Sequence, residues 1–261
     1  MLVAPYFNKG LTIHLNGKIV SSSYIILTKK LMIEFGAEVE FMGNTISIKP
    51  VPYQYHKSNY HVESDWTAAS YWFAFAVLSK KASIFLEGLT NKSFQGDALV
   101  APLFNMYGIQ HSFIDDGMQI IKSHHDGFIH IFDFIDNPDL VQTFAFLNAA
   151  LGLPLQVNQA ANLIHKESNR IEALTIELSK IGAKLHANNH DDFSIESNSS
   201  FNSEPVIFET YKDHRMAMSA SMLALKFDSI KITNPDVVLK SYPEFWIHLS
   251  QAGFTIKQIL A

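Results

Sequence analysis

The sequence of 261 residues contains no cysteine, which excludes disulfides, thiolate metal sites and a cysteine nucleophile. Only 17% of the residues are charged and the net charge is −5, so no general basic field for nucleic acid is expected. The longest strongly apolar run, residues 68–78, is too short to span a bilayer. The N-terminus lacks the basic and long apolar regions of a signal peptide. We therefore expect a soluble, cytoplasmic protein, with 48% hydrophobic residues to build a sizeable core.

Four glycines mark an internal repeat. Gly36, Gly108, Gly182 and Gly253 each close an amphipathic stretch and precede an alternating one, at spacings of 72, 74 and 71 residues. Glycine commonly follows a helix because it accepts the left-handed backbone that ends one. Chance rarely keeps such a period, so we infer a repeated structural unit.

Three stretches, 65–78, 138–151 and 213–225, are apolar nearly all round. This pattern is typical of buried helices. Each is followed by a short strand, a polar loop, an amphipathic helix, a glycine and usually a hairpin, as at 41–48 and 113–121. The sequence thus predicts an α/β (α+β) fold of repeated units, each with one buried helix, one outer helix and several strands.

The repeat is incomplete at both ends. Counting back one period from Asp65 places an earlier buried-helix start before Met1, so residues 1–7 are predicted to be the last turn of such a helix. After Gly253 there is room for one strand and no return strand. We expect a chain truncated at its front relative to its architecture, with a boundary near 62–64 that separates domains 1–64 and 65–261.

The stretch 164–185 has cations at an unusual place. Lys166, Glu167 and Arg170 lie in the predicted opening turn of an outer helix, where the helix dipole favours acids over bases. Lys166 and Arg170 are four residues apart and share a face. Together with unpaired helix N–H groups they would bind an anion, and neighbouring cations would keep Glu167 ionised. The alternative is a solvated helix start with an ordinary Glu cap.

Arg215 is a second cation in the first turn of a predicted buried helix, where the helix dipole disfavours bases. His214 and Arg215 lie in its predicted first turn, behind Asp213, which is an ordinary N-cap candidate. A buried arginine requires a partner, and a phosphate or a carboxylate fits its planar fork. Asp139 follows Pro138 at another buried-helix start. By itself it indicates no more than a normal first turn.

Two polar clusters, 123–130 and 186–192, contain His and Asp close together. Neither has an established metal-ligand spacing, so we interpret both as polar turns near hairpins.

Several motifs occur together in a recognisable order. They include "ESDWTAASYWFA" (63–74), "SFQGD" (93–97), "NPDLVQT" (137–143), "NLIHKESNRIEAL" (162–174), "ETYKDHRMAMSASMLAL" (209–225) and "KSYPEFW" (240–246). In order and approximate spacing the chain resembles the C-terminal portion of the 5-enolpyruvylshikimate-3-phosphate synthase family. The combination of "KES-x-R" with "DHRMAM" is the most specific part of the resemblance.

The resemblance implies a fold of two lobes, each built from three βαβαββ units as an inside-out α/β barrel. Residues 65–261 resemble one nearly complete lobe, and residues 1–64 resemble the last, incomplete unit of the other. The N-terminal part of the family has no counterpart in the sequence.

The implied activity is transfer of the enolpyruvyl group of phosphoenolpyruvate to the 5-hydroxyl of shikimate 3-phosphate with release of phosphate, a step of aromatic amino acid biosynthesis. The family requires no metal and no organic cofactor. The implied partners are the two substrates and, as a candidate, a separate N-terminal fragment, with no nucleic acid and no membrane.

Site residues follow from the resemblance position by position. Asp139 corresponds to the carboxylate that takes the 5-hydroxyl proton, Glu167 to the acid–base group at the methylene carbon, and His214 to their neighbour. These three are the expected catalytic residues. The expected substrate-binding residues are Ser21, Tyr24, Asn162, Lys166, Arg170, Arg215 and Lys240.

Two departures and two alternatives accompany this reading. Asn169 replaces an acid that is usual in the family, and residues 21–24 lack the usual proline before Tyr24. One alternative is a non-catalytic remnant that binds anions. The other is the sister UDP-N-acetylglucosamine enolpyruvyl transferase, against which the "KESNR" and "DHRMAM" combination argues.

Overall fold

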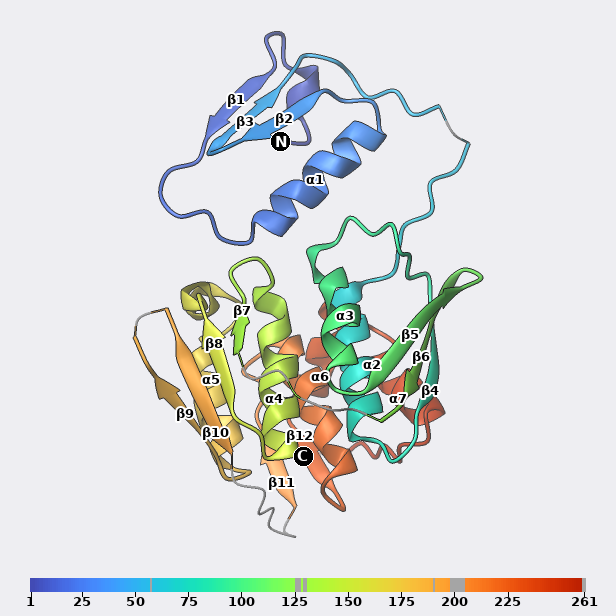
Figure 1. Cartoon of the computed structure of the whole chain (residues 1–261), viewed down its shortest axis with the longest axis vertical. Helices are drawn as coiled ribbons and strands as arrows, with labels where there is room; N and C mark the ends of the chain where they lie inside the picture. Colours follow the sequence, from blue (N-terminus) through green and yellow to red (C-terminus); the bar gives the residue numbers. More distant parts are fainter. Residues whose placement is uncertain (57, 125–127, 129–130, 190, 198–204, 260–261) are drawn as a thin grey trace.

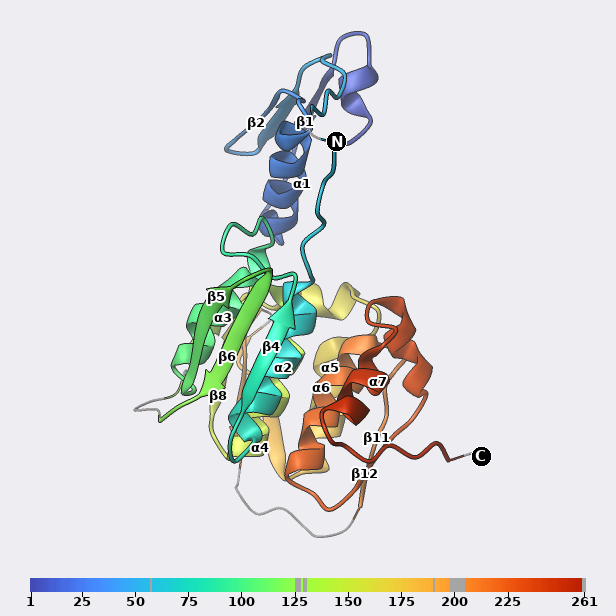
Figure 2. The same cartoon turned by 90° about the vertical axis from the view of Figure 1, so that its right-hand side faces the viewer.

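A computed structural model describes residues 1–56, 58–124, 128, 131–189, 191–197 and 205–259. Figures 1 and 2 show a smaller part, which holds α1 and β1 to β3, above a larger part that holds all the other labelled elements. An extended stretch after β3 connects the two parts. Buried apolar side chains form two separate clusters, one in each part.

The smaller part is a three-stranded antiparallel sheet with a helix packed against it. The strands follow the order β1-β3-β2, and α1 packs against β2. Gly43, with φ of 55°, lies in the tight turn that joins β2 to β3, as the predicted hairpin requires. The bounds are β1 (Leu11–His14), α1 (Ser22–Glu34), β2 (Val39–Met42) and β3 (Thr45–Ile48).

The larger part packs three sheets around three central helices. One sheet is antiparallel with the order β4-β6-β5, a second has the order β7-β8-β10-β9, and a third is the parallel pair β11-β12. The strands are β4 (Ser83–Glu87), β5 (Ile109–Ile114), β6 (Gly117–Lys122), β7 (Ile131–Asp133), β8 (Leu155–Asn158), β9 (Ala183–Ala187), β10 (Phe193–Ser197), β11 (Val206–Phe208) and β12 (Ile230–Ile232).

The central helices are the ones predicted to be buried. In α2 (Trp66–Leu78) and α4 (Val141–Leu151) almost every side chain is buried, and α4 packs against both α2 and α6 (His214–Ser221). One pair of polar groups lies inside this core, where the hydroxyls of Ser70 and Thr143 are 3.0 Å apart across the α2–α4 contact. A helix without a polar face is stable only in such a position, so the pattern read from the sequence is confirmed.

The outer helices are α3 (Val100–Asn105), α5 (Arg170–Ser179) and α7 (Phe245–Gln251). The middle unit runs β7, α4, β8, α5, β9, β10 and is a full βαβαββ unit. The four repeat glycines have φ values of 87°, 79°, 81° and 100°. They therefore occupy the left-handed conformation that the repeat predicted.

Two predictions about the chain ends are wrong. Residues 254–259 contain no strand, since they lack the ladder partner that a strand requires. Near the N-terminus, residues 4–6 form a 3₁₀ turn that begins with Ala4 and Pro5 rather than the end of an α-helix. Among the described residues no helix is long and apolar enough to cross a membrane.

Candidate functional site

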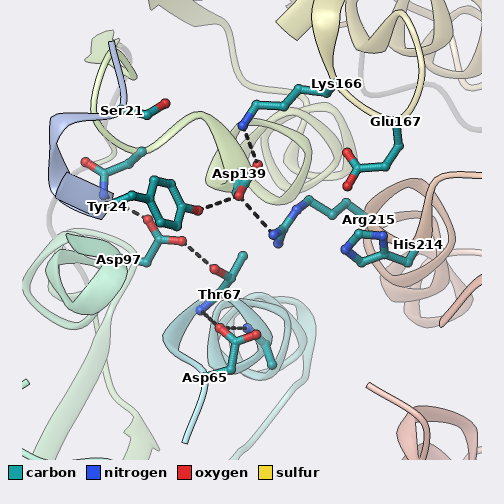
Figure 3. Close-up of polar contacts among 12 residues, drawn as sticks. Ser21, Tyr24, Asp65, Thr67, Asp97, Asp139, Lys166, Glu167, His214 and Arg215 are labelled. Carbon is teal, nitrogen blue, oxygen red and sulfur yellow. Dashed lines mark hydrogen bonds and ion pairs between the residues drawn. The ribbon is translucent and has the colours of Figure 1, made fainter. Parts of the chain in front are cut away.

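Asp139 lies in the 3₁₀ turn that leads into α4 and contacts Tyr24 of the smaller part. Its Oδ1 accepts a hydrogen bond from Arg170 at 2.8 Å and lies 3.4 Å from the Lys166 ammonium. Its Oδ2 accepts from Tyr24 at 2.6 Å and from Arg215 at 3.0 Å. We call these five residues the Asp139 cluster, most of which Figure 3 shows converging on the carboxylate.

The cations of the cluster control the charge of Asp139. Burial alone would raise the pKa of this carboxyl, but Arg215, Lys166, the Tyr24 hydrogen bond and Arg170 together hold it well below its usual range. Asp139 is therefore ionised, and both of its oxygens are occupied.

Arg170 is fully buried and bonded on every side. Its Nε donates to Asp213, one terminal nitrogen to Asp139 and the other to Glu167, each at 2.8 Å. These contacts tie the starts of α4, α5 and α6 together. Such a buried charge is tolerated because its whole fork is paired.

The prediction that Lys166, Glu167 and Arg170 all lie in the opening turn of α5 is wrong for the first two residues. The α-helix begins at Arg170, and Lys166 and Glu167 precede it, after a 3₁₀ turn over Ala161–His165. Asn169 is the reason, because its side chain accepts from the Glu172 N–H and caps the helix. Lys166 and Glu167 therefore lie in an irregular segment just before the start of α5.

Glu167 connects the buried cluster to the surface. Its second oxygen accepts from Lys240 at 2.6 Å, and the Lys240 side chain is 57% exposed. Burial opposes ionisation of Glu167, but the hydrogen bond from Lys240, its own backbone N–H and Arg170 lower its pKa to about 2. Glu167 is therefore also a carboxylate at neutral pH.

Arg215 has fewer protein partners than Arg170. One nitrogen donates to Asp139, whereas the buried Nε has no hydrogen-bond partner among the described residues. Burial raises the pKa of the neighbouring Tyr71 hydroxyl, and Arg215 opposes that rise. Asp213 accepts from the Arg215 backbone N–H at 2.9 Å, which confirms it as the N-cap of α6.

His214 lies beside this group and makes few bonds. Its Nδ1 finds no hydrogen-bond partner among the described residues and lies 3.9 Å from an Asp213 oxygen. Burial and Arg215 lower the pKa of the ring, so the imidazole is neutral near pH 7.

The smaller part contributes Ser21 and Tyr24 from the start of α1. The Asn162 amide donates to the Ser21 hydroxyl at 3.4 Å, while its buried side-chain oxygen has no partner in the described part of the chain. The N–H and hydroxyl of Ser22 donate to one oxygen of Asp136 at 2.8 and 2.7 Å. A residue of the larger part thus caps α1 and fixes where Tyr24 reaches.

Contacts connect seven of the ten expected site residues, namely Tyr24, Asp139, Lys166, Glu167, Arg170, Arg215 and Lys240. His214 lies beside Asp213, and Ser21 and Asn162 contact each other. Sequence reasoning missed Asp136, whose contact with Ser22 spans 114 residues and leaves no local pattern. It also missed Asp97, a buried carboxylate next to the cluster, which accepts from Asn137 at 2.8 Å and from the Thr67 hydroxyl. Burial raises the pKa of the Asp97 carboxyl above its ordinary value. Its only sequence signal was its place near an outer-helix start.

No group of three His, Asp or Glu side chains in the described ranges is arranged to hold a metal. In the 186–192 stretch, Asn189 bonds Asp192 within the turn between β9 and β10, as a polar turn would. The 123–130 stretch falls largely outside the described residues.

The arrangement is suited to an anionic ligand. Lys166, Arg170, Arg215 and Lys240 provide four cations, against the carboxylates of Asp139, Glu167 and Asp213. Among the described residues the Arg215 Nε has no hydrogen-bond partner. Ionised carboxylates beside these cations supply groups for proton transfer.

The chain matches the model of one protein family over residues 1–249, namely EPSP synthase (3-phosphoshikimate 1-carboxyvinyltransferase). A 3-phosphoshikimate 1-carboxyvinyltransferase of Bacteroides fragilis is 39% identical over 258 residues, which are 98% of this chain and 62% of that protein. The enzyme of the same name from Nostoc punctiforme is 32% identical, over 96% and 58%. The chain therefore spans about three-fifths of the length of these curated relatives.

Solved structures give the same picture. An EPSP synthase from Acinetobacter baumannii aligns with a TM-score of 0.68 and 25% identity, over 88% of this chain and 55% of that one. The enolpyruvyl transferase NikO from Streptomyces tendae aligns with a TM-score of 0.72 over all of this chain and 59% of its own. At 15% identity, NikO shows the fold alone.

Proposed function

Because this chain belongs to the EPSP synthase family, we propose that it provides the catalytic carboxylates and a phosphoenolpyruvate-binding surface of a 3-phosphoshikimate 1-carboxyvinyltransferase. In that reaction the 5-hydroxyl oxygen of shikimate 3-phosphate bonds to C2 of phosphoenolpyruvate while C3 gains a proton. The tetrahedral intermediate then loses a proton from C3 and releases phosphate. The observation that carries the proposal is the Asp139 carboxylate, on which three cations and the Tyr24 hydroxyl converge.

Asp139 takes the proton from the 5-hydroxyl in this proposal. Its low pKa makes it a weak base while Lys166 and Arg215 are bonded to it. An incoming phosphate or carboxylate competes for these cations. As they turn toward the substrate, the pKa of Asp139 rises toward a value that suits a general base.

Glu167 exchanges the proton at C3 of phosphoenolpyruvate. Lys240 holds it ionised in the same way, and the exposed Lys240 side chain is free to move toward a substrate anion. The neutral ring of His214, beside Asp213 and Arg215, completes the expected catalytic set.

Arg215 is the principal cation for phosphoenolpyruvate, with Arg170 behind it. Arg215 is 13% exposed and holds an unused donor, whereas Arg170 is fully enclosed by carboxylates. Ser21, Tyr24 and Asn162 face the same region from the boundary with the smaller part and suit the hydroxyls and phosphate of shikimate 3-phosphate.

Two separate apolar cores support domains 1–64 and 65–261. The family match favours this reaction over an anion-binding remnant and over transfer to a UDP-sugar. The cytoplasmic location expected from the sequence stays a prediction.

Phosphate release from shikimate 3-phosphate and phosphoenolpyruvate tests the function. We expect no turnover from these 261 residues alone, because about two-fifths of the length of the Bacteroides fragilis relative has no match in this chain. Adding the unmatched segment of the Bacteroides fragilis relative should restore turnover, and Glu167→Ala in the mixture should abolish it. Saturable turnover by the chain alone, or by the Glu167→Ala mixture, contradicts the proposal.

A further inference from the structure

The segment that delivers Asp213 and Arg215 begins with a turn in an unfavourable backbone conformation. Tyr211 and Lys212 have φ values of 53° and 59°, and the Asp213 N–H donates to the Thr210 carbonyl at 2.8 Å. Two successive left-handed residues closed by such a bond are usual where Asn and Gly occupy the turn. Side chains with a Cβ pay a conformational cost there, so something else must hold this turn in place.

A fully buried carboxylate from α5 contacts the turn. Glu177 is 0% exposed and accepts a hydrogen bond from the Tyr211 hydroxyl at 2.7 Å. It also accepts from the Glu209 backbone N–H at 3.0 Å and from Lys180 at 2.7 Å. The Glu177 carboxylate therefore binds the segment at two residues, at the strained Tyr211 and at Glu209 before it.

The same helix holds the far side of the segment. Arg170, two helical turns before Glu177 on α5, donates to Asp213 at 2.8 Å. Asp213 in turn caps α6 through the Arg215 N–H. One helix thus holds the segment 209–213 at both ends, and Arg215 lies two residues beyond it.

We propose that Glu177 is a positioning residue, which holds the strained Tyr211–Lys212 turn so that Arg215 is presented to the substrate anion. This inference rests on the proposed function for its ligand, phosphoenolpyruvate. The hydrogen bonds of Glu177 described here go to Lys180, Glu209 and Tyr211, and none of these residues belongs to the Asp139 cluster. The contribution of Glu177 is the preorganisation of an arginine that has few other partners.

The first test is calorimetric titration of phosphoenolpyruvate into the chain. Glu177→Gln should weaken binding about tenfold, and Tyr211→Phe, which removes only the hydroxyl, about threefold. Glu209→Gln is the matched control, because this exposed side chain bonds Thr233 instead of the turn and should leave binding unchanged. A Lys212→Gly change relieves the strain, so in the Glu177→Gln background it should recover at least half of the lost affinity.

The second test needs no ligand. Hydrogen exchange of the backbone amides in 209–215 should accelerate in Glu177→Gln and in Tyr211→Phe but not in Glu209→Gln. If the wild-type chain binds no phosphoenolpyruvate, the proposed function fails, and the exchange rates still decide whether Glu177 holds the turn. Unchanged exchange in both variants overturns the inference. So does a Glu177→Gln chain that folds and binds phosphoenolpyruvate as tightly as wild type.

Discussion

Arg170 and Arg215 look alike in the sequence, since each stands in the first turn of a helix that should disfavour it. Their surroundings differ. Arg170 is completely buried and donates to three carboxylates, those of Asp139, Glu167 and Asp213. Among the described residues Arg215 pairs with the carboxylate of Asp139 alone, its Nε has no hydrogen-bond partner, and its side chain is 13% exposed.

The difference in surroundings indicates that the two arginines serve different purposes, one structural and one in ligand binding. A ligand could reach Arg170 only by displacing a protein carboxylate, so this arginine is suited to joining α4, α5 and α6. Arg215 has donor capacity left and is suited to bind an anion directly. Arginines at the starts of helices are therefore not equivalent. The number of carboxylates around each one indicates whether it stabilises the structure, as Arg170 does, or is suited to bind a ligand, as Arg215 is.

The largest expected effect on stability comes from removing one of the carboxylates that pair with Arg170. Asp213→Ala removes a fully buried partner and leaves a buried charge partly unpaired, which should cost about 3–5 kcal/mol of unfolding free energy. Urea unfolding followed by circular dichroism measures it. Glu38→Ala is the control, because it breaks the exposed pair with Lys49 and should change nothing measurable. Equal midpoints for the two variants would refute the structural role of Arg170.

A smaller effect concerns pH and tests the Glu167 carboxylate, which Lys240 and Arg170 hold ionised. The pKa of Glu167 is lowered from 4.5 to about 2 in the folded state, so its contribution to stability is fully present above its unfolded pKa. This contribution is lost as pH falls through the folded value. We expect the stability difference between wild type and Glu167→Gln to shrink as pH is lowered through this window. A difference that stays constant down to pH of about 2 would show that Arg170 gains nothing from the Glu167 charge.

The smallest effect is expected at the contact from the smaller part. Tyr24→Phe removes one hydrogen bond to Asp139, worth about 1 kcal/mol, and leaves all three cations in place. Thermal unfolding of Tyr24→Phe should begin earlier than that of Tyr6→Phe, whose side chain is 63% exposed. Identical curves would mean that Tyr24 does not couple the two parts.

Much of this organisation could be predicted from the sequence, because periodic patterns are local. The buried helices α2 and α4 follow from their almost uniformly apolar runs and α6 from a mostly apolar one, and Gly36, Gly108, Gly182 and Gly253 mark the repeated helix ends. The motif resemblance also named residues that do gather around Asp139.

The pairing of charges could not be predicted, because it depends on distant contacts. Asp213 was expected to cap α6, yet its other oxygen neutralises Arg170 from 43 residues away. Asp136 caps α1 across the two parts. The N-cap choice at Asn169 moved the start of α5 beyond Lys166 and Glu167, a one-turn difference that the hydrophobic spacing does not fix.

The most direct test of the account is calorimetric titration of phosphoenolpyruvate into wild type and into Arg215→Gln, with urea unfolding of both chains. We predict saturable binding to wild type and at least a hundredfold loss in Arg215→Gln, about the loss of two charge-assisted hydrogen bonds, with far less destabilisation than in Asp213→Ala. Equal affinity in the two chains, or no binding to wild type, would contradict the claim that Arg215 is the open cation of an anion-binding site.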